Sequence, residues 1–153
     1  MSDRGARLLL LGGAASGLVA ALHAVIIAVG APGYRYFGAG EEMARLDERG
    51  SPVPALVTAA ITAVFAIWSA YGFSGAGLLR RLPLLRTGLV TIGAIYTLRG
   101  LACLPEAWWL AVGRAPAVLP RQIVFSAVSL AIGLAYLTGA RRAWSTLGAR
   151  NKA

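Results

Sequence analysis

Two side chains of this sequence could do chemistry within an apolar segment. His23 is the only histidine, and its imidazole can take up or release a proton near neutral pH. Arg99 lies among apolar residues, and its guanidinium can bind a carboxylate or a phosphate through two parallel hydrogen bonds. Tyr96 lies three residues before Arg99, which puts both on the same face of a helix. Together these residue types favour the binding of a small anionic ligand.

Both residues also have a structural explanation. The long stem of Arg99 can lift its guanidinium to a membrane surface, and Glu106 follows nearby in the sequence. The imidazole of His23 can form a hydrogen bond with Tyr96, with a hydroxyl group or with a backbone carbonyl. A ligand-binding role and a packing role therefore stay open for each residue.

Recognisable catalytic and metal-binding motifs are absent from the sequence. It lacks the phosphate-binding loop, the serine nucleophile elbow and the His-Glu-x-x-His zinc motif. Because Cys103 is the only cysteine and His23 the only histidine, a haem or zinc site would need ligands from two chains. We expect no cofactor, no metal and no catalytic residues, and a binding protein rather than an enzyme.

Long apolar segments must position these residues. Hydrophobic residues make up 58% of the 153 residues and charged residues 14%, whereas soluble proteins have about 45–50% and about 25%. A helix needs about 20 mainly apolar residues to cross a bilayer. Four runs approach that length, at 8–30, 54–73, 87–104 and 123–140. We expect an all-α protein with a single domain over residues 1–153, an antiparallel four-helix bundle in a membrane, with the first run retained as an anchor.

Charged residues are distributed unevenly around these runs. The N-terminus, the second loop and the C-terminal tail are strongly basic, whereas acidic residues offset the basic ones of the first and third loops. The positive-inside rule then places both termini in the cytoplasm and loops one and three outside. The net charge of +9 therefore marks membrane ends and does not predict nucleic-acid binding. Because arginine greatly outnumbers lysine, we expect the bacterial inner membrane.

Small and polar side chains fall on one face of each run. At 100° per residue, Gly13, Gly17 and His23 share a face of the first run. Helices in lipid associate through such faces. At 1.5 Å per residue, His23 lies about 10 Å and Arg99 about 8 Å below the outer end of its run. The polar groups are therefore expected to meet in a pocket that opens outward.

The expected pocket draws on all four runs and on the first external loop. Arg99 would fix the charge of the ligand, and His23 and Tyr96 would form hydrogen bonds with it. A glutamate of the loop would neutralise the empty site. The ligand-binding residues that we expect are Arg99, His23, Tyr96, Glu41, Glu42, Thr58, Gln122 and Ser126.

The first external loop has helix start and stop signals. Residues 34–37 are expected to form an aromatic anchor and residues 41–49 a short helix, because acidic residues stand at its start and a glycine follows its end. Glu41 and Arg45 have the spacing of a favourable ion pair. The helix either lies in the membrane interface over the bundle, or acts as a lid that brings Glu41 or Glu42 toward the pocket.

The third external loop is expected to hold Trp108 and Trp109. Paired tryptophans at this level usually anchor a protein at the membrane surface, and their rings can also form a wall for a ligand.

Several segments resemble those of small uncharacterised four-span membrane proteins of bacteria. The resemblance rests on His23 with residues 34–41, on residues 71–77 and on residues 98–101, and it covers most of the chain. It implies the four-span fold and the membrane location, and it implies no activity.

The sequence favours a membrane protein that binds, and in one version transports, a small anionic or lipid-like ligand. A second hypothesis is an accessory subunit whose small-residue faces meet another copy of the chain or a membrane partner. A third is an intramembrane enzyme that acts on a lipid, with His23 as general base. The lipid bilayer is the expected partner in all three.

Overall fold

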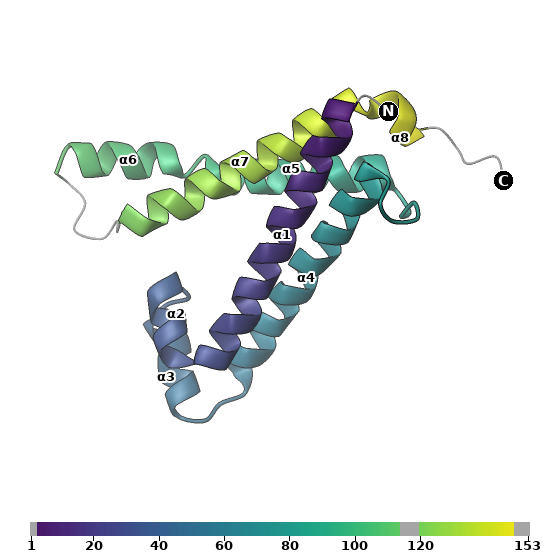
Figure 1. Cartoon of the computed structure of the whole chain (residues 1–153). Coiled ribbons are helices and arrows are strands. Elements are labelled where there is room, and N and C mark those ends of the chain that lie inside the picture. Colours follow the sequence, from purple (N-terminus) through teal and green to yellow (C-terminus); the bar gives the residue numbers. More distant parts are fainter. Residues whose placement is uncertain (1–2, 114–119, 149–153) are drawn as a thin grey trace. The chain divides into compact units, whose positions relative to one another are not determined.

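The computed structural model describes residues 3–113 and 120–148, and these residues form helices and short connections, with no strand among them. The expected all-α class is confirmed (Figure 1). The helices are α1 (Asp3–Val29), α2 (Ala31–Phe37), α3 (Glu41–Glu48), α4 (Val53–Ala76), α5 (Leu85–Gly100), α6 (Cys103–Ala111), α7 (Pro120–Arg142) and α8 (Trp144–Gly148).

Four helical segments are long and apolar enough to cross a membrane. They are Arg4–Val29, Val53–Ala76, Leu85–Ala111 and Pro120–Arg142, with 26, 24, 27 and 23 residues. Each exceeds the length of about 20 residues that a bilayer requires. The four runs expected from the sequence lie within these segments to within one residue, so the order and number of long apolar helices are as predicted.

Large apolar side chains cover the outer faces of these helices. Leu18 is 72% exposed, Leu56 65% and Leu98 70%. The opposite faces carry the small and polar residues, and Ser16, Thr58 and Ser126 are among the buried ones. In water, so many exposed leucines and valines would be a liability, whereas in lipid the arrangement is favourable. The small and polar face predicted for the first run is therefore found, whereas Arg99 of the third run is exposed.

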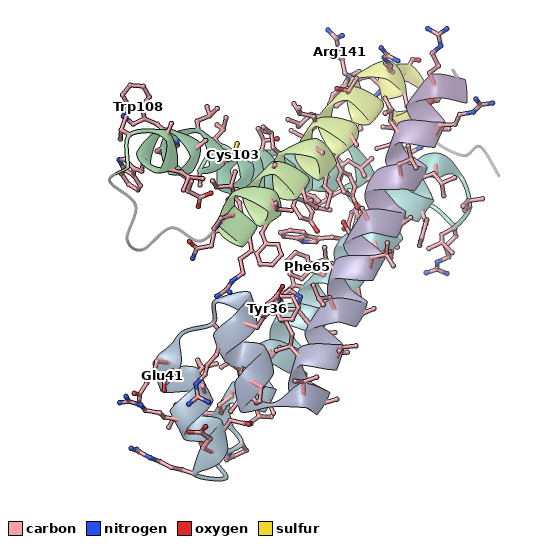
Figure 2. All side chains as sticks on the ribbon, turned by 60° about the vertical axis from the view of Figure 1, so that its left-hand side comes forward. Tyr36, Glu41, Phe65, Cys103, Trp108 and Arg141 are labelled. Carbon is pink, nitrogen blue, oxygen red and sulfur yellow. The ribbon has the colours of Figure 1, made fainter. Side chains whose placement is uncertain are left out.

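The third long segment does not end where the sequence suggested. A turn at Leu101 and Ala102 separates α5 from α6, and α6 continues through the two tryptophans. The prediction that Trp108 and Trp109 lie in a loop is thus wrong. Pro105 is tolerated there because it stands in the first turn of α6, where no intrahelical N–H bond is lost. Both tryptophans are exposed, and Figure 2 shows Trp108 pointing away from α6. Pro116 lies outside the described residues.

The first loop contains two helices where the sequence predicted one. The predicted helix at 41–49 is α3, while the aromatic segment expected at 34–37 is itself helical and ends α2. Gly38 ends α2 in the left-handed conformation, with φ 84°, which glycine adopts without strain. Tyr34 is fully buried in a small cluster with Ile26, Ala44 and partly buried neighbours. The contacts between α2 and α3 therefore hold the loop in a compact form.

The chain comprises two compact units. The first unit takes its residues from Met1–Ala14 and Ala70–Ala153, and the second unit is Ala15–Ser69. In the first unit, α5 packs along α7 at glycines. A Cβ atom on Gly133 would lie 2.5 Å from the Thr97 backbone nitrogen, and one on Gly100 would lie 2.5 Å from the Leu130 Cα. Only glycine permits this approach of two helix backbones.

Glycines also bring α1 and α4 together within each unit. In the first unit, a Cβ atom on Gly72 would lie 2.5 Å from the Gly13 Cα. In the second unit, a Cβ atom on Gly17 would lie 3.1 Å from the Ser69 hydroxyl oxygen. The pair Gly13 and Gly17 therefore serves helix packing inside the chain.

Candidate functional site

The expected ligand-binding residues are divided between the two units. The first unit contains Tyr96, Arg99, Gln122 and Ser126, and the second contains His23, Glu41, Glu42 and Thr58.

Arg99 and Ser126 are brought together in the first unit. Nη1 of Arg99, on α5, donates a hydrogen bond of 2.7 Å to Oγ of Ser126 on α7, and Ser126 is fully buried. The contact follows from the packing, because Gly100 adjoins Arg99 and touches Leu130, one turn after Ser126. The guanidinium is thus held against the neighbouring helix by a neutral hydroxyl group.

No acidic side chain pairs with Arg99 among residues 3–113 and 120–148. Glu106, which follows it in the sequence, does not neutralise it. The Oε2 atom of Glu106 is buried and accepts no hydrogen bond from the described part of the chain. Arg99 is therefore exposed, with one neutral hydrogen-bond partner and most of its N–H donors left over.

Tyr96 lies one turn before Arg99 in a buried aromatic pair. Its ring stacks on that of Tyr136, with ring centres 6.2 Å apart and planes inclined by 10°. Tyr96 is 4% exposed and Tyr136 is fully buried. Gln122 lies one turn before Ser126 on α7 and is half-buried. Tyr96 thus lies one turn before Arg99 on α5, and Gln122 lies one turn before Ser126 on α7.

His23 adopts the backbone-bonded arrangement in the second unit. Its Nδ1 lies 2.8 Å from the carbonyl oxygen of Val19, one turn earlier in α1. Because a carbonyl oxygen only accepts, Nδ1 is the donor in this hydrogen bond. The ring also packs against Phe65, with ring centres 5.1 Å apart. The imidazole is therefore oriented by its own helix, with Nε2 as its remaining polar atom.

Thr58 is buried at the beginning of α4, 6% exposed. Its backbone carbonyl accepts a hydrogen bond of 2.8 Å from the hydroxyl group of Thr62. This contact satisfies the Thr62 hydroxyl within the helix and leaves Thr58 as a polar group on the inner face of α4.

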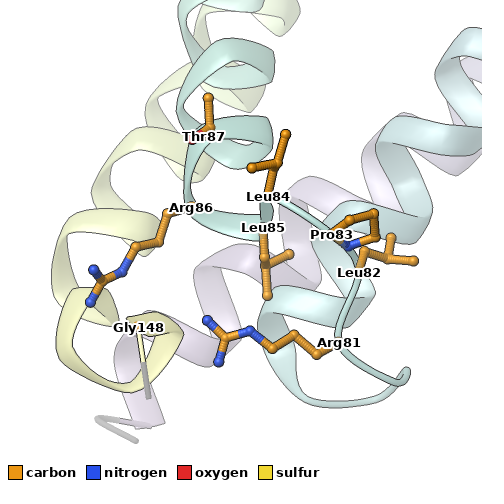
Figure 3. Close-up of a pocket in the computed structure, with 8 residues that line it drawn as sticks. All are labelled: Arg81, Leu82, Pro83, Leu84, Leu85, Arg86, Thr87 and Gly148. Carbon is orange, nitrogen blue, oxygen red and sulfur yellow. The ribbon is translucent and has the colours of Figure 1, made fainter. Parts of the chain in front are cut away.

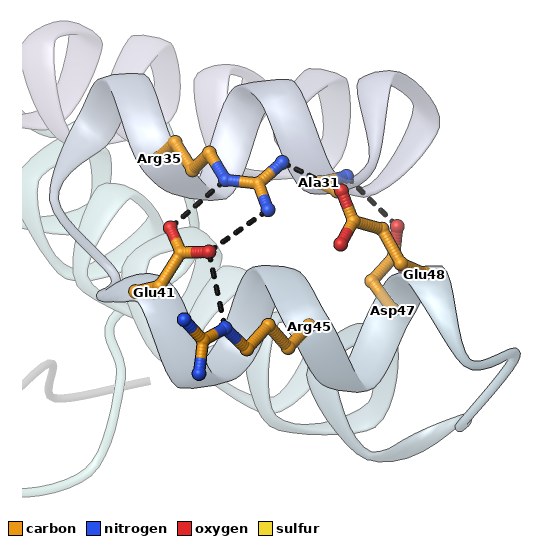
Figure 4. A network of polar contacts seen from close by, with 6 residues as sticks. All are labelled: Ala31, Arg35, Glu41, Arg45, Asp47 and Glu48. Atoms are coloured by element: carbon orange, nitrogen blue, oxygen red, sulfur yellow. Dashed lines mark hydrogen bonds and ion pairs between the residues drawn. The ribbon is translucent and has the colours of Figure 1, made fainter.

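Glu41 belongs to an ion-pair network between α2 and α3, shown in Figure 4. Arg35 binds both of its oxygens, through Nε at 2.9 Å and Nη2 at 3.0 Å, and also donates to Glu48 at 2.7 Å. Arg45 donates to Glu41 at 3.3 Å, as its spacing predicted. Glu42 is exposed and makes no ion pair with the described residues. The glutamate expected to serve a ligand site is thus held by arginines of its own loop.

The charges of this network stabilise one another. Hydrogen bonds from Arg35 hold the pKa of Glu41 and that of Glu48 below the usual range for a glutamate. The same contacts raise the pKa of Arg35 above its usual value. Both acids are therefore ionised at neutral pH, and the network is fully formed there.

Arg35 is the organising residue that the sequence reasoning missed. The spacing of Glu41 and Arg45 within one helix was readable, whereas Arg35 reaches Glu41 only because 34–37 is helical and α2 folds back on α3. The Pro at residue 32, next to the start of α2, is the signal that could have indicated this helix.

The described residues contain no cluster of metal-ligating side chains. Within the described residues, no three side chains of His, Cys, Asp or Glu gather closely enough to hold a metal ion. The charged group that stands out is the guanidinium of Arg99, which can bind an anion.

No family model matches this chain, and neither a curated protein nor a solved structure is significantly similar to it. The function of this chain is therefore inferred from its fold and its side-chain contacts.

Proposed function

We propose that this chain is a multi-pass membrane protein that binds a small anionic or lipid-like ligand through Arg99. The observation that carries the proposal is the Arg99 guanidinium itself. It lies on an apolar helix, donates to the hydroxyl group of Ser126, and has no acidic partner among the described residues. A charged side chain in a membrane span costs about 2.5–3.5 kcal/mol and calls for compensation. An anionic ligand supplies it.

The donors of Arg99 suit a carboxylate or a phosphate. A guanidinium has five N–H groups in a fixed plane, and the bond to Ser126 uses one of them on Nη1. The others can bind two oxygens of one anion in parallel. Because Ser126 fixes the guanidinium before a ligand arrives, little side-chain freedom is lost on binding.

The remaining expected residues take supporting roles in this proposal. With both termini in the cytoplasm of a bacterial inner membrane, Arg99 would lie near the middle of the third long segment, Leu85–Ala111. Tyr96 and Gln122 lie one turn before Arg99 and Ser126 within the first unit. In an extended version of the proposal, the protein also transports the ligand that Arg99 binds.

A titration tests the proposal. The full-length protein in neutral detergent is titrated with dodecyl phosphate, and tryptophan fluorescence is recorded, because Trp108 and Trp109 lie in the helix that follows Arg99. We expect saturable binding that Arg99→Gln weakens by about tenfold or more, since a hydrogen bond to a charged group is worth about 1.5–3 kcal/mol. Dodecyltrimethylammonium, which has the opposite charge, should give no saturable response.

Arg49→Gln is the matched control. It removes one exposed arginine on the same proposed side of the membrane, and Arg49 makes no ion pair with the described residues. This variant should bind dodecyl phosphate like the wild type. Equal weakening by both substitutions, or no saturable binding by the wild type, would contradict the proposal.

A role as an accessory subunit is the second candidate, and Glu106 favours it. Its buried Oε2 accepts no hydrogen bond from the described residues, so a basic group of a partner helix could satisfy it. Purification from native membranes separates the two candidates. A stoichiometric protein partner without a bound small anion would favour the accessory role.

A further inference from the structure

A second basic site lies at the opposite end of α5 from Arg99. An open pocket of about 860 Å³ is formed by the connection between α4 and α5, the first turn of α5 and the end of α8 (Figure 3). Arg86 and Arg99 are thirteen residues apart on α5, or about 20 Å along its axis. The two arginines cannot serve one small ligand.

Two guanidinium groups enter this pocket without an acidic neighbour in its wall. Arg81 and Arg86 both line it, and Figure 3 shows their side chains directed toward Gly148. The lining contains no aspartate or glutamate. Gly148 makes room for the group from Arg86, because a Cβ atom at this position would overlap Nη2 of Arg86. The pocket is therefore a concentration of positive charge that suits an anion.

Arg86 is fixed in place and still has donors for a ligand. Nη2 donates to the Trp144 carbonyl, and the guanidinium lies 4.6 Å from the centre of the Trp144 ring. The Nε atom is buried and has no hydrogen-bond partner among the described residues. A buried donor of this kind is costly to leave unpaired. The N–H groups of Nη1 and the second N–H of Nη2 are the donors left for an anion seated against the guanidinium.

The backbone adds donors at the same place. α5 begins at Leu85 without a side-chain cap, so the first N–H groups of this helix have no intrahelical acceptor. Thr87, which also lines the pocket, adds a hydroxyl group. These groups complement the two arginines, because N–H groups at a helix start attract a negative charge.

Leucines beside the arginines indicate the source of the anion. Leu82 and Leu84 line the same pocket, and Leu84 is 78% exposed. Just before Arg81, Leu78 and Leu79 are 65% and 47% exposed. A soluble phosphate has no apolar part that could contact these leucines, whereas a phospholipid has acyl chains next to its phosphate. The pocket also lies at the ends of long apolar helices, where lipid headgroups would be found.

We infer that this pocket binds the phosphate group of an anionic phospholipid, with Arg81 and Arg86 as its two cationic contacts. Basic pockets between helices at the cytoplasmic surface are suited to such headgroups. The inference shares with the proposed function the membrane placement of the long helices, and it does not depend on Arg99.

Native mass spectrometry of the full-length protein in neutral detergent tests the inference. The protein is titrated with palmitoyl-oleoyl-phosphatidylglycerol, and in parallel with the zwitterionic phosphatidylcholine of the same chains. We expect one phosphatidylglycerol to bind more tightly than phosphatidylcholine. The double substitution Arg81→Gln with Arg86→Gln should weaken this binding by about fivefold or more, as expected for the loss of two charge-assisted hydrogen bonds.

Two single substitutions keep the test decisive. Arg80→Gln is the matched control, because Arg80 is the exposed neighbour of Arg81 in the same loop and does not line the pocket. It should change the affinity less than twofold. Arg81→Gln alone leaves the contacts of Arg86 with Trp144 intact and should still weaken binding, so the outcome does not depend on the folding of the double variant.

Three results would overturn the inference. Equal weakening by Arg80→Gln and Arg81→Gln would mean that general surface charge, rather than the pocket, attracts the lipid. Equal affinity for the two lipids would exclude recognition of the net charge. Displacement of phosphatidylglycerol by glycerol phosphate at similar concentration would assign the pocket to a soluble phosphate. Arg99→Gln should leave this lipid binding unchanged, which separates the result from that of the proposed function.

Discussion

The α2–α3 pair and the α5–α7 pair each contain an arginine that joins two helices, and they treat its charge differently. Arg35 joins α2 to α3 through two glutamates, and Arg45 completes the network. Arg99 joins α5 to α7 through the neutral Ser126, without an acidic partner among the described residues. A network that is neutralised internally needs nothing more, whereas an unneutralised guanidinium on an apolar helix indicates a group supplied from outside.

The two helix pairs also differ in how closely their backbones approach. α5 and α7 approach at Gly100 and Gly133, where any side chain would strike the opposite backbone. α2 and α3 are short and meet through a small cluster around Tyr34 and through exposed ion pairs. We therefore expect the α5–α7 contact to be rigid and sensitive to substitution, and the α2–α3 contact to be weaker and sensitive to charge.

Among the substitutions that test this difference between the helix pairs, Gly133→Ala is expected to have the largest effect. The new methyl group would meet the Thr97 backbone, force α5 away from α7 and break the contact between Arg99 and Ser126. We expect the free energy of unfolding to fall by about 1–3 kcal/mol, as for other overpacked sites. Unfolding in mixed micelles with an increasing fraction of dodecyl sulfate measures this change.

Gly17→Ala is the control for that experiment. Its methyl group would meet only the Ser69 side chain, and alanine favours a helix, so the change should stay below about 1 kcal/mol. An equal loss in the two variants would show that the α5–α7 contact is no tighter than the rest.

A smaller effect is expected from Ser126→Ala. This substitution leaves Arg99 and its charge in place and removes the group that orients the guanidinium. Binding of dodecyl phosphate should weaken about three- to tenfold, less than in Arg99→Gln, since orientation is lost while charge is kept. The fluorescence titration described for Arg99 gives the value. Unchanged affinity would show that Ser126 has no positioning role, and Ser129→Ala, one turn further along α7, is the matched control.

The smallest effect is an acid sensitivity confined to α2 and α3. The pKa values of Glu41 and Glu48 are lowered by hydrogen bonds from Arg35. A group whose pKa is lower in the folded state contributes stability above its unfolded-state pKa, and loses it as the pH falls through the lowered value. Amide hydrogen exchange in α3, corrected for the intrinsic rate, should therefore become faster at acidic pH than at neutral pH.

Arg35→Gln sharpens this last expectation. Without Arg35, exchange in α3 should be faster at neutral pH and should change little on acidification. An acid sensitivity of the same size in the variant would mean that groups other than this network cause it.

The long helices could be predicted from the sequence because their signal is local. Apolar runs of sufficient length gave all four, and in the first run the 100° spacing correctly separated exposed Leu18 from buried Ser16. The boundary at the tryptophans was placed wrongly, because Pro105 and Glu106 suggested a loop where the first turn of α6 accommodates both.

The contacts of the candidate site were harder to predict, because they depend on which helices pack together. The sequence offered Glu106 or a ligand as the partner of Arg99, and the observed partner, Ser126, follows from the close packing at Gly100. Likewise, the pocket around Arg81 and Arg86 needs the end of α8, which is far away in the sequence. The roles of His23, Glu41, Glu42, Thr58 and Gln122 toward a ligand stay predictions.

Native mass spectrometry of protein extracted gently from its own membranes tests the central claim most directly. We predict an anionic small molecule that binds the wild type in addition to any phospholipid held at Arg81 and Arg86, that is present at the same level in Arg49→Gln and that is missing from Arg99→Gln. A wild-type protein that carries no such molecule, or an Arg99→Gln variant that retains it, would contradict the claim.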